Sequence, residues 1–331
     1  MCLDVKDKVN MVESDEQLAT RRLRVAVAGL GVIGEGAALR LTDASEPYAL
    51  CAALVRDPDK ARANDLAQLR IYTDPEVLLV EHPDVVIDAL PTGEAGRRLI
   101  EAALSRGISV VTANKQAIAG AMSPLNMLAS QNKATFAYSA SVGGGAPMVE
   151  TARKARAAGE VRSITAILNG TVNYILSSMK DGASFLDAVK QAQDAGFAEP
   201  DPTADLSGED ARAKISILTY EAFGREIENS AIKVEALDSM LAQSFVEKGG
   251  SWKQLSVINK KSDGGITARV GFARVDDDAF FSSIGGEGNA LRIINMDGRD
   301  FTCEGKGAGR APTVGSIFSD LEAIARQPVG R

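Results

Sequence analysis

The stretch "LRVAVAGLGVIG", residues 23–34, decides the fold of this chain. It begins with a near-continuous apolar run, as in a strand that is buried on both faces of a sheet. The residues that follow have helical spacing, with apolar side chains at Ile33, Ala37, Ala38 and Leu41. The stretch therefore predicts a buried strand, a tight glycine turn and a helix.

The turn carries Gly29, Gly31 and Gly34 in the spacing G-x-G-x-x-G. In this arrangement the first glycine permits the tight turn, the second lets a pyrophosphate approach the backbone, and the third lets helix and strand pack closely. The phosphates then lie at the free N–H groups of a helix N-terminus. Glycines also mark ordinary turns, but the strand before and the helix after them favour a dinucleotide site. We expect this site to be formed by Gly29, Gly31, Val32, Ile33 and Gly34.

Strand and helix patterns continue to alternate after this unit. Apolar runs predict strands at residues 48–55, 84–90, 108–114 and 134–142, and residues 94–107 have the spacing of a helix. Parallel βαβ units of this kind form a doubly wound sheet, which binds its ligand at the carboxyl ends of the strands. The expected fold class is therefore α/β, a Rossmann-like doubly wound parallel sheet, with "PTGEAG" (91–96) and "TANKQ" (112–116) beside a nicotinamide.

The second predicted strand ends at Arg56 and Asp57. An acid just past this strand prefers a free ribose 2′-hydroxyl, whereas an arginine accommodates a 2′-phosphate. Because Arg56 comes first, we expect NADP(H) to be favoured, and Asp57 keeps NAD(H) as an alternative. An exposed Arg-Asp turn with no role in binding is the other interpretation.

The pattern changes after the glycine-rich segment "SVGGGAP", residues 141–147. Residues 161–170 predict a strand, and helices follow at 171–182, 184–195 and 206–224, the last with Ser207 as its N-cap. The segments near 262–306 alternate like antiparallel strands. We expect a flexible extension (1–22), a dinucleotide-binding domain (23–140 plus 308–331) and a second, α+β domain for substrate binding and dimerisation (141–307).

The composition excludes several classes of protein. A net charge of −7 over 331 residues argues against nucleic acid or an anionic membrane as partner. No apolar run reaches the roughly 18 residues of a membrane span, and no secretion signal is visible. Three scattered cysteines suit a cytoplasmic location. His82 is the single histidine, so zinc sites of the Cys/His type and Ser-His-Asp catalysis lack their parts.

A nicotinamide enzyme that oxidises an alcohol needs a base for the hydroxyl proton. No tyrosine of the chain is followed by a lysine four residues later, which removes the Tyr-x-x-x-Lys pair. What remains is Lys115 at a predicted strand end, and Lys214 one helical turn after Asp210. If both lysines line one pocket, we expect like-charge repulsion and desolvation to lower their pKa values. The alternatives are an exposed Asp210–Lys214 ion pair and a solvated Lys115.

Longer motifs resemble those of homoserine dehydrogenases. "VVTANKQAIA", "SVGGGAP", "ILNGTVNYIL", "GFAEPDPTADLSGEDARAK" and "GKGAGRAPTVGSIFSDL" follow "GLGVIG" in the order of that family, over roughly residues 23–325. The resemblance implies NAD(P)-dependent interconversion of L-homoserine and L-aspartate 4-semialdehyde, in the branch toward threonine, methionine and isoleucine. It also implies a homodimer with a small amino-acid substrate.

The resemblance assigns roles to individual residues. Lys214 matches the lysine regarded as proton donor and acceptor, Lys115 the lysine that bridges cofactor and substrate, and Thr92 a threonine near the nicotinamide. The residues implied to bind substrate are Gly170, Thr171, Glu199, Asp205, Asp210 and Lys214. Elimination and resemblance thus lead to the same two lysines.

The chain departs from the family pattern in three places. Phe197 stands where a tyrosine is common, so a phenolic hydroxyl near the substrate is missing. Ser139 stands where a glutamate often helps to bind sodium, and the carbonyls of Val142, Gly144 and Ala146 would have to hold a monovalent cation with this weaker ligand. The C-terminal regulatory ACT domain of longer members is not expected, and with it feedback by threonine through such a domain.

Two other functions remain open from the sequence. One is a related dehydrogenase that acts on another small amino acid or semialdehyde, because Phe197 could reshape the pocket. The other is a dinucleotide-binding sensor without catalysis. Lys115, Glu199, Asp210 and Lys214 together argue against the sensor, since a binding module needs no proton carrier.

Overall fold

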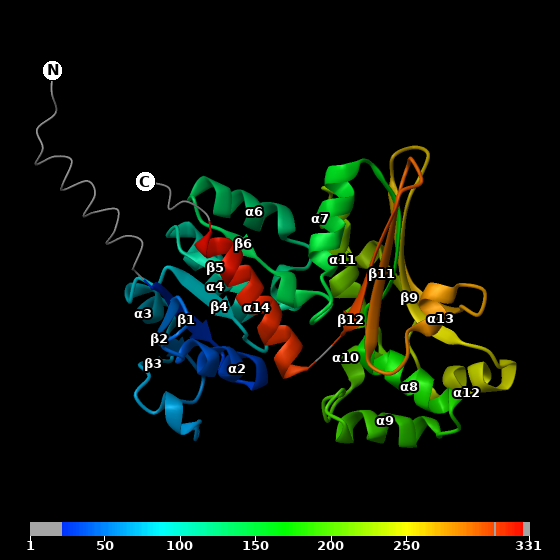
Figure 1. Cartoon of the computed structure of the whole chain (residues 1–331), viewed down its shortest axis with the longest axis horizontal. Helices are drawn as coiled ribbons and strands as arrows, with labels where there is room; N and C mark the ends of the chain where they lie inside the picture. Colours follow the sequence, from blue (N-terminus) through cyan, green and yellow to red (C-terminus); the bar gives the residue numbers. More distant parts are fainter. Residues whose placement is uncertain (1–21, 308, 327–331) are drawn as a thin grey trace, which may run out of the picture.

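The computed structural model describes residues 22–307 and 309–326. Within these residues two six-stranded sheets stand beside each other, each with its own helices (Figure 1). The predicted fold class, a Rossmann-like parallel sheet with a second α+β region, is confirmed. The expected extension at 1–22 lies outside the described residues, apart from Arg22. The domain boundaries stay a prediction.

The first sheet has the strand order β3-β2-β1-β4-β5-β6, and its neighbouring strands are parallel. Its strands are β1 (Leu23–Ala28), β2 (Tyr48–Leu54), β3 (Ile71–Tyr72), β4 (Val85–Asp88), β5 (Ser109–Thr112) and β6 (Phe136–Ala137). The strand order reverses between β1 and β4, and the crevice at their carboxyl ends is where such sheets bind dinucleotides. The predicted strand 134–142 is shorter than expected: it ends at Ala137, and Ser139–Ser141 form a 3₁₀ turn.

Helices cover both faces of this sheet. One face carries α2 (Val32–Leu41) and α14 (Arg310–Ala325), which returns from the end of the chain and packs on α2 (Figure 1). The ring of Phe318 on α14 meets that of Tyr48 edge-on, with 5.8 Å between centroids. The rest of this region consists of η1 (Asn64–Leu66), α3 (Pro75–Val80), α4 (Gly93–Ser105), α5 (Lys115–Ile118) and α6 (Met122–Gln131).

The glycine turn between β1 and α2 is as tight as its motif predicts. Gly29 has a φ of +87°, a conformation that glycine adopts at little cost. A Cβ on Gly34 would lie 1.7 Å from the carbonyl oxygen of Gly29, so only glycine lets α2 pack this closely on the turn. A Cβ on Gly31 would meet nothing within 4 Å. The three glycines therefore serve two purposes: close packing, and open space in front of the helix.

The second sheet has the order β12-β11-β7-β9-β10-β8, and its long strands pair antiparallel. Its strands are β7 (Val161–Ile167), β8 (Lys233–Val234), β9 (Trp252–Lys260), β10 (Ile266–Arg274), β11 (Gly288–Asn295) and β12 (Asp300–Lys306). The "NMDG" turn joins β11 to β12 as a hairpin. The helical elements of this region are α7 (Met148–Ala158), α8 (Gly170–Lys180), α9 (Phe185–Asp194), α10 (Thr203–Leu206), α11 (Glu209–Phe223), η3 (Asn229–Ala231), α12 (Ser239–Lys248) and α13 (Ala279–Ser283).

Helices α7 and α11 pack on one face of this sheet and also against the first region. Buried side chains of α4, α6, α7, α11 and the second sheet belong to one continuous apolar core. Helix α11 is buried along almost its whole length, and contacts α5 and α6 as well as β9. The buried polar side chains of α11, among them Asp210 and Lys214, are therefore enclosed by protein and need partners there.

The start of α11 corrects one prediction. Ser207 is not its N-cap, because Ser207 ends the short helix α10. Gly208 precedes Glu209 in the left-handed conformation, with a φ of +78°, and separates α10 from α11.

Within residues 22–307 and 309–326, no helix is long and apolar enough to cross a bilayer.

Replacement of Gly34 by alanine should lower the free energy of unfolding by about 1–3 kcal/mol, because the added methyl group overlaps the turn. Gly31→Ala is the matched control: it has room, so the unfolding midpoint in urea should not change, although dinucleotide affinity should fall. Equal midpoints for both variants would contradict the packing role of Gly34.

Candidate active site

A cavity of about 450 Å³ lies between the carboxyl end of the first sheet and helices α8, α10 and α11. It collects all the residues predicted to bind substrate or to act in catalysis: Lys115, Gly170, Thr171, Glu199, Asp205, Asp210 and Lys214. Ile33, predicted to bind the cofactor, and Gly144, predicted as a cation ligand, line it too. The remaining predicted residues do not line it: Gly29, Gly31, Val32, Gly34, Arg56, Thr92, Val142 and Ala146. Asp201 lines the cavity as well and was not predicted.

Asp210 stands between the two lysines. Its Oδ2 atom is 2.8 Å from Nζ of Lys214, on the next turn of α11, and its Oδ1 atom is 2.9 Å from Nζ of Lys115, at the start of α5. Asp210 and Lys214 are buried, and Lys115 is half-buried. The alternative of an exposed Asp210–Lys214 ion pair is therefore wrong, and so is that of a fully solvated Lys115.

The charges of this triad shift the pKa values of its members. Burial acts to raise the pKa of Asp210, but the ammonium groups of Lys214 and Lys115 outweigh it and hold that pKa well below the usual range. The carboxylate of Asp210 raises the pKa of Lys115 against the effect of burial. The expectation of a lowered pKa is thus wrong for Lys115, because a carboxylate lies between the two lysines.

Asn169 organises the acidic side of the cavity, and sequence reasoning missed it. Its Oδ1 atom accepts the N–H of Val172 at 2.8 Å, which caps α8. Its Nδ2 atom donates to Asp205 Oδ1 at 2.8 Å and to Asp210 Oδ2 at 3.1 Å. One buried amide thereby fixes two carboxylates that would otherwise repel each other. The available signal was an asparagine two residues before the predicted helix 171–182, within the segment predicted as a strand.

The carboxylates around the cavity differ in environment. Burial and the charge of Asp210 raise the pKa of Asp205, and the hydrogen bond from Asn169 offsets part of this. Glu199 is exposed at the rim, where its charge helps to raise the pKa of Lys115. The cavity therefore offers the half-buried carboxylate of Asp205 and the exposed carboxylate of Glu199 beside two ammonium groups.

Phe197 lines this cavity and takes a packing position in its wall. Its ring lies against that of Tyr174, with 5.1 Å between centroids. Its carbonyl accepts the hydroxyl of Thr171 at 2.6 Å. Phe197 therefore holds the loop before α10 to the first turn of α8, a contact that requires no phenolic hydroxyl.

A buried polar network lies under Lys115. Asp88, at the end of β4, accepts the hydroxyl of Thr112 at 2.9 Å and the N–H of Leu90 at 3.0 Å. Asn114 caps α5 through the N–H of Ala117 and donates to the carbonyl of Thr92 at 2.9 Å. Burial raises the pKa of Asp88 to about 6. The network joins the ends of β4 and β5 and sets where α5, and hence Lys115, begins.

The glycine turn has the properties of a dinucleotide cradle. Helix α2 begins after Gly31 without any side-chain cap, and Val32 is 68% exposed, so the first N–H groups of the helix face open space. Arg56 is exposed at the end of β2. The carboxylate of Asp57 accepts the N–H of Asp59 at 3.0 Å and is thus used within its own turn.

The expected cation ligands lie in a crowded loop. The carbonyl of Gly144 accepts the hydroxyl of Ser316 at 2.6 Å, and that of Ala146 accepts the N–H of Met148 at 2.8 Å. Ser139 is buried, and its N–H donates to Asp320 at 2.9 Å. Within the described part of the chain, no three His, Cys, Asp or Glu side chains cluster as metal ligands. A monovalent cation at Val142, Gly144 and Ala146 stays a prediction.

Comparison with known proteins gives the family. Residues 29–139 match the family model "Homoserine dehydrogenase, NAD binding domain", and residues 147–321 match the model "Homoserine dehydrogenase". A homoserine dehydrogenase of Neisseria gonorrhoeae is 30% identical over 316 residues, which cover 92% of this chain and 72% of the relative. The chain belongs to the homoserine dehydrogenase family. The predicted function, an oxidoreductase of this family with a nicotinamide dinucleotide cofactor, is confirmed.

Two further relatives support the same assignment. An NAD(+)-dependent homoserine dehydrogenase of Pseudomonas canavaninivorans is 34% identical over 246 residues, or 72% of this chain and 70% of the relative. The crystal structure of a homoserine dehydrogenase from Thiobacillus denitrificans superposes with a TM-score of 0.82 at 29% identity, over 92% of this chain and 73% of that one. Homoserine dehydrogenases thus share both the sequence pattern and the fold of this chain.

Asp88 should make the stability of this homoserine dehydrogenase depend on pH. Its pKa of about 6 exceeds the ordinary 3.8, so the folded state binds the proton more tightly than the unfolded chain does. This contribution is complete below pH 3.8 and is lost as the pH rises to about 6. Asp88→Asn cannot ionise. Between pH 4 and 7 the wild type should therefore lose about 1–3 kcal/mol relative to the variant.

Urea unfolding of both proteins across this pH range measures the difference. Asp194→Asn, at an exposed position at the end of α9, is the matched control and should follow the wild type at every pH. Parallel curves for wild type and Asp88→Asn would show that Asp88 is ionised in the fold with no penalty.

Proposed function

We propose that the cavity at Asp210 catalyses the reversible oxidation of L-homoserine to L-aspartate 4-semialdehyde, in the branch toward threonine, methionine and isoleucine. The observation that carries this proposal is the buried Asp210 carboxylate with the ammonium groups of Lys115 and Lys214 on its two oxygens. It joins the carboxyl end of the dinucleotide sheet, through Lys115, to helix α11 of the second region. An alcohol bearing an ammonium and a carboxylate fits this set of charges.

Lys214 is the proposed proton carrier. Two of its contacts are with protein, Asp210 Oδ2 at 2.8 Å and the carbonyl of Leu168 at 2.8 Å. An ammonium has three N–H donors, so one remains for the oxygen of the substrate. In the direction of oxidation neutral Lys214 accepts the hydroxyl proton, and in reduction the ammonium donates it to the aldehyde oxygen. The bound nicotinamide supplies the hydride acceptor or donor.

The remaining groups orient the substrate. Glu199 and Asp205 are the proposed partners of the substrate ammonium, and Lys115 is the proposed bridge between substrate and cofactor. Gly170 and Thr171 open α8 at the cavity wall, where the N-terminus of a helix favours the substrate carboxylate. The proposed role of Asp210 is to hold Lys115 and Lys214 in position through its two oxygens.

The proposed cofactor site is the cradle of Gly29, Gly31, Val32, Ile33 and Gly34, with Thr92 near the nicotinamide. NADP(H) is the proposed preference, because exposed Arg56 is available for a 2′-phosphate while Asp57 is used within its own turn. The NAD(+)-dependent relative from Pseudomonas keeps NAD(H) as the second candidate.

A homodimer is proposed for the assembly. Strands of the second sheet alternate between side chains buried under α7 and α11, such as Ile164 and Ile293, and side chains on the opposite face, such as Thr165 and Arg292. That opposite face is the proposed contact between two copies, and sedimentation at equilibrium should give twice the mass of the chain. A cytoplasmic location also stays a prediction.

Lys214→Ala should reduce kcat with L-homoserine by about 100-fold or more, the usual contribution of a positioned proton carrier. Affinity for NADPH should change little, because Lys214 lies on the substrate side. Lys190→Ala, at an exposed position on α9, is the matched control and should keep full activity. Wild-type turnover in Lys214→Ala would reduce this lysine to a structural ion pair.

Arg56→Ala should lower kcat/KM for NADP⁺ by about tenfold, the loss of a charge-assisted contact with phosphate, while leaving the value for NAD⁺ nearly unchanged. Arg98→Ala, on the exposed face of α4, is the control and should alter neither value. If the two values fall together in Arg56→Ala, this arginine does not distinguish the two cofactors.

A further inference from the structure

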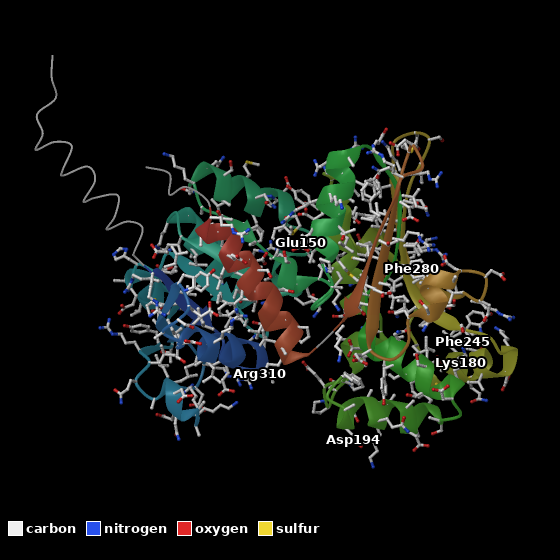
Figure 2. All side chains as sticks on the ribbon, in the orientation of Figure 1. Glu150, Lys180, Asp194, Phe245, Phe280 and Arg310 are labelled. Atoms are coloured by element: carbon white, nitrogen blue, oxygen red, sulfur yellow. The ribbon has the colours of Figure 1, made fainter. Side chains whose placement is uncertain are left out.

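A second cavity, of about 410 Å³, lies at the opposite end of α8 from the active-site cavity. It is lined by the C-terminal end of α8, by α12, by the start of β9 and by the loop after α13. Lys180 and Phe245 mark its place at the outer edge of the second region, on the side away from the first sheet (Figure 2). None of the proposed catalytic or cofactor residues lines this cavity, which we call the outer cavity.

Lys253 is buried at the outer cavity with only uncharged partners. Lys253 is only 5% exposed. Its Nζ atom donates to Asn173 Oδ1 at 2.8 Å and to the carbonyl of Ile284. Among the residues that the structure describes, no carboxylate lies within 4.0 Å of this ammonium. A buried charge normally has a partner of opposite charge, because its desolvation is otherwise not offset.

A second ammonium faces the same space. Nζ of Lys180, on the last turn of α8, donates to the hydroxyl of Ser251 at 2.7 Å. Burial first, and then the charge of Lys180, lower the pKa of Lys253 to about 8. The nearby carboxylate of Asp276 is already bound by Arg274 and by the N–H of Ser251. The outer cavity thus holds two cations, and the carboxylate of Asp276 is already engaged by other groups.

The walls of the outer cavity combine polar groups with a set of apolar side chains. Leu176 and Met179 of α8, Phe245 of α12, Trp252 and Ile284 line it, and the rings of Phe245 and Trp252 are stacked with 4.4 Å between centroids. Asp181 lines the cavity too, so its interior is not uniformly positive. An anion with an apolar body suits such walls better than a fully hydrated inorganic anion does.

We propose that the outer cavity is a binding site for a small organic carboxylate, with its anionic group at Lys180 and Lys253 and its apolar part against Phe245 and Trp252. Two ammonium groups at one partly open cavity supply the charge, and each keeps N–H donors for the ligand beyond those bound to protein. This site is separate from the active site and does not depend on the proposed catalytic roles.

Trp252 provides a direct measurement, because it is the single tryptophan of the chain and lines the outer cavity. The full-length protein is titrated with 4-methylvalerate, a carboxylate with a branched apolar body, while tryptophan emission is recorded. A saturable change in emission is expected. Inorganic phosphate, titrated in the same way, should give no saturable change.

Four substitutions test the assignment. Lys180→Met and Lys253→Met should each weaken the response to 4-methylvalerate by about tenfold or more, as expected for loss of a charge-assisted contact. Lys248→Met is the matched control: Lys248 lies over the ring of Trp252, with Nζ 5.6 Å from the centroid, but does not line the cavity, so the affinity should persist. Lys214→Ala should also keep the response, which would exclude the active site as its source.

Three results would overturn the proposal. The emission shows no saturable change with 4-methylvalerate, phosphate binds with equal affinity, or the response to 4-methylvalerate survives in Lys180→Met. If buried Lys253→Met does not fold, Lys180→Met decides, because Lys180 is exposed at the helix end and its loss removes a single hydrogen bond, the one to the hydroxyl of Ser251. Near-ultraviolet circular dichroism of each variant verifies the fold before titration.

Discussion

The Asp210 carboxylate, shared between the ammonium groups of Lys115 and Lys214, is the interaction on which the site depends. Lys115 is the first residue of α5, which follows β5 of the first sheet, whereas Asp210 and Lys214 belong to α11 of the second region. One buried carboxylate therefore ties the two regions together at the cavity. Its burial is costly, and the two cations and the amide of Asn169 offset that cost.

Helix α11 can carry this carboxylate because it is anchored at its other end as well. Glu221, near its C-terminus, accepts the hydroxyl of Tyr138 and the Nε–H of Arg153, the latter at 2.9 Å. Tyr138 follows β6 of the first sheet, so this second polar cluster again joins the two regions. With both ends held and the length between them packed in the core, α11 keeps Lys214 at a defined place.

Much of the architecture was predictable, because buried parallel strands and the glycine turn leave local patterns in the sequence. The two lysines were also found from the chain alone, since histidine, zinc and Tyr-Lys chemistry lack their residues. The raised pKa of Lys115 was not predictable, because it depends on a carboxylate from a helix far along the chain. Asn169 and Asp88 were missed for the same reason: buried polar partners are set by tertiary contacts. The prediction that Ser207 caps α11 was wrong, because Gly208 separates the short helix α10 from α11.

The need for the shared carboxylate in catalysis is measured most directly by the steady-state turnover of Asp210→Asn with L-homoserine. The affinity of the same variant for NADPH is measured beside it. The amide is nearly isosteric but uncharged, so the two ammonium groups lose their common partner and repel each other. We predict a fall in kcat of about 100-fold with NADPH affinity unchanged, while Asp201→Asn, exposed at the rim of the same cavity, stays near wild type. Wild-type kcat in Asp210→Asn would contradict the account, because the shared carboxylate would then not be needed for catalysis.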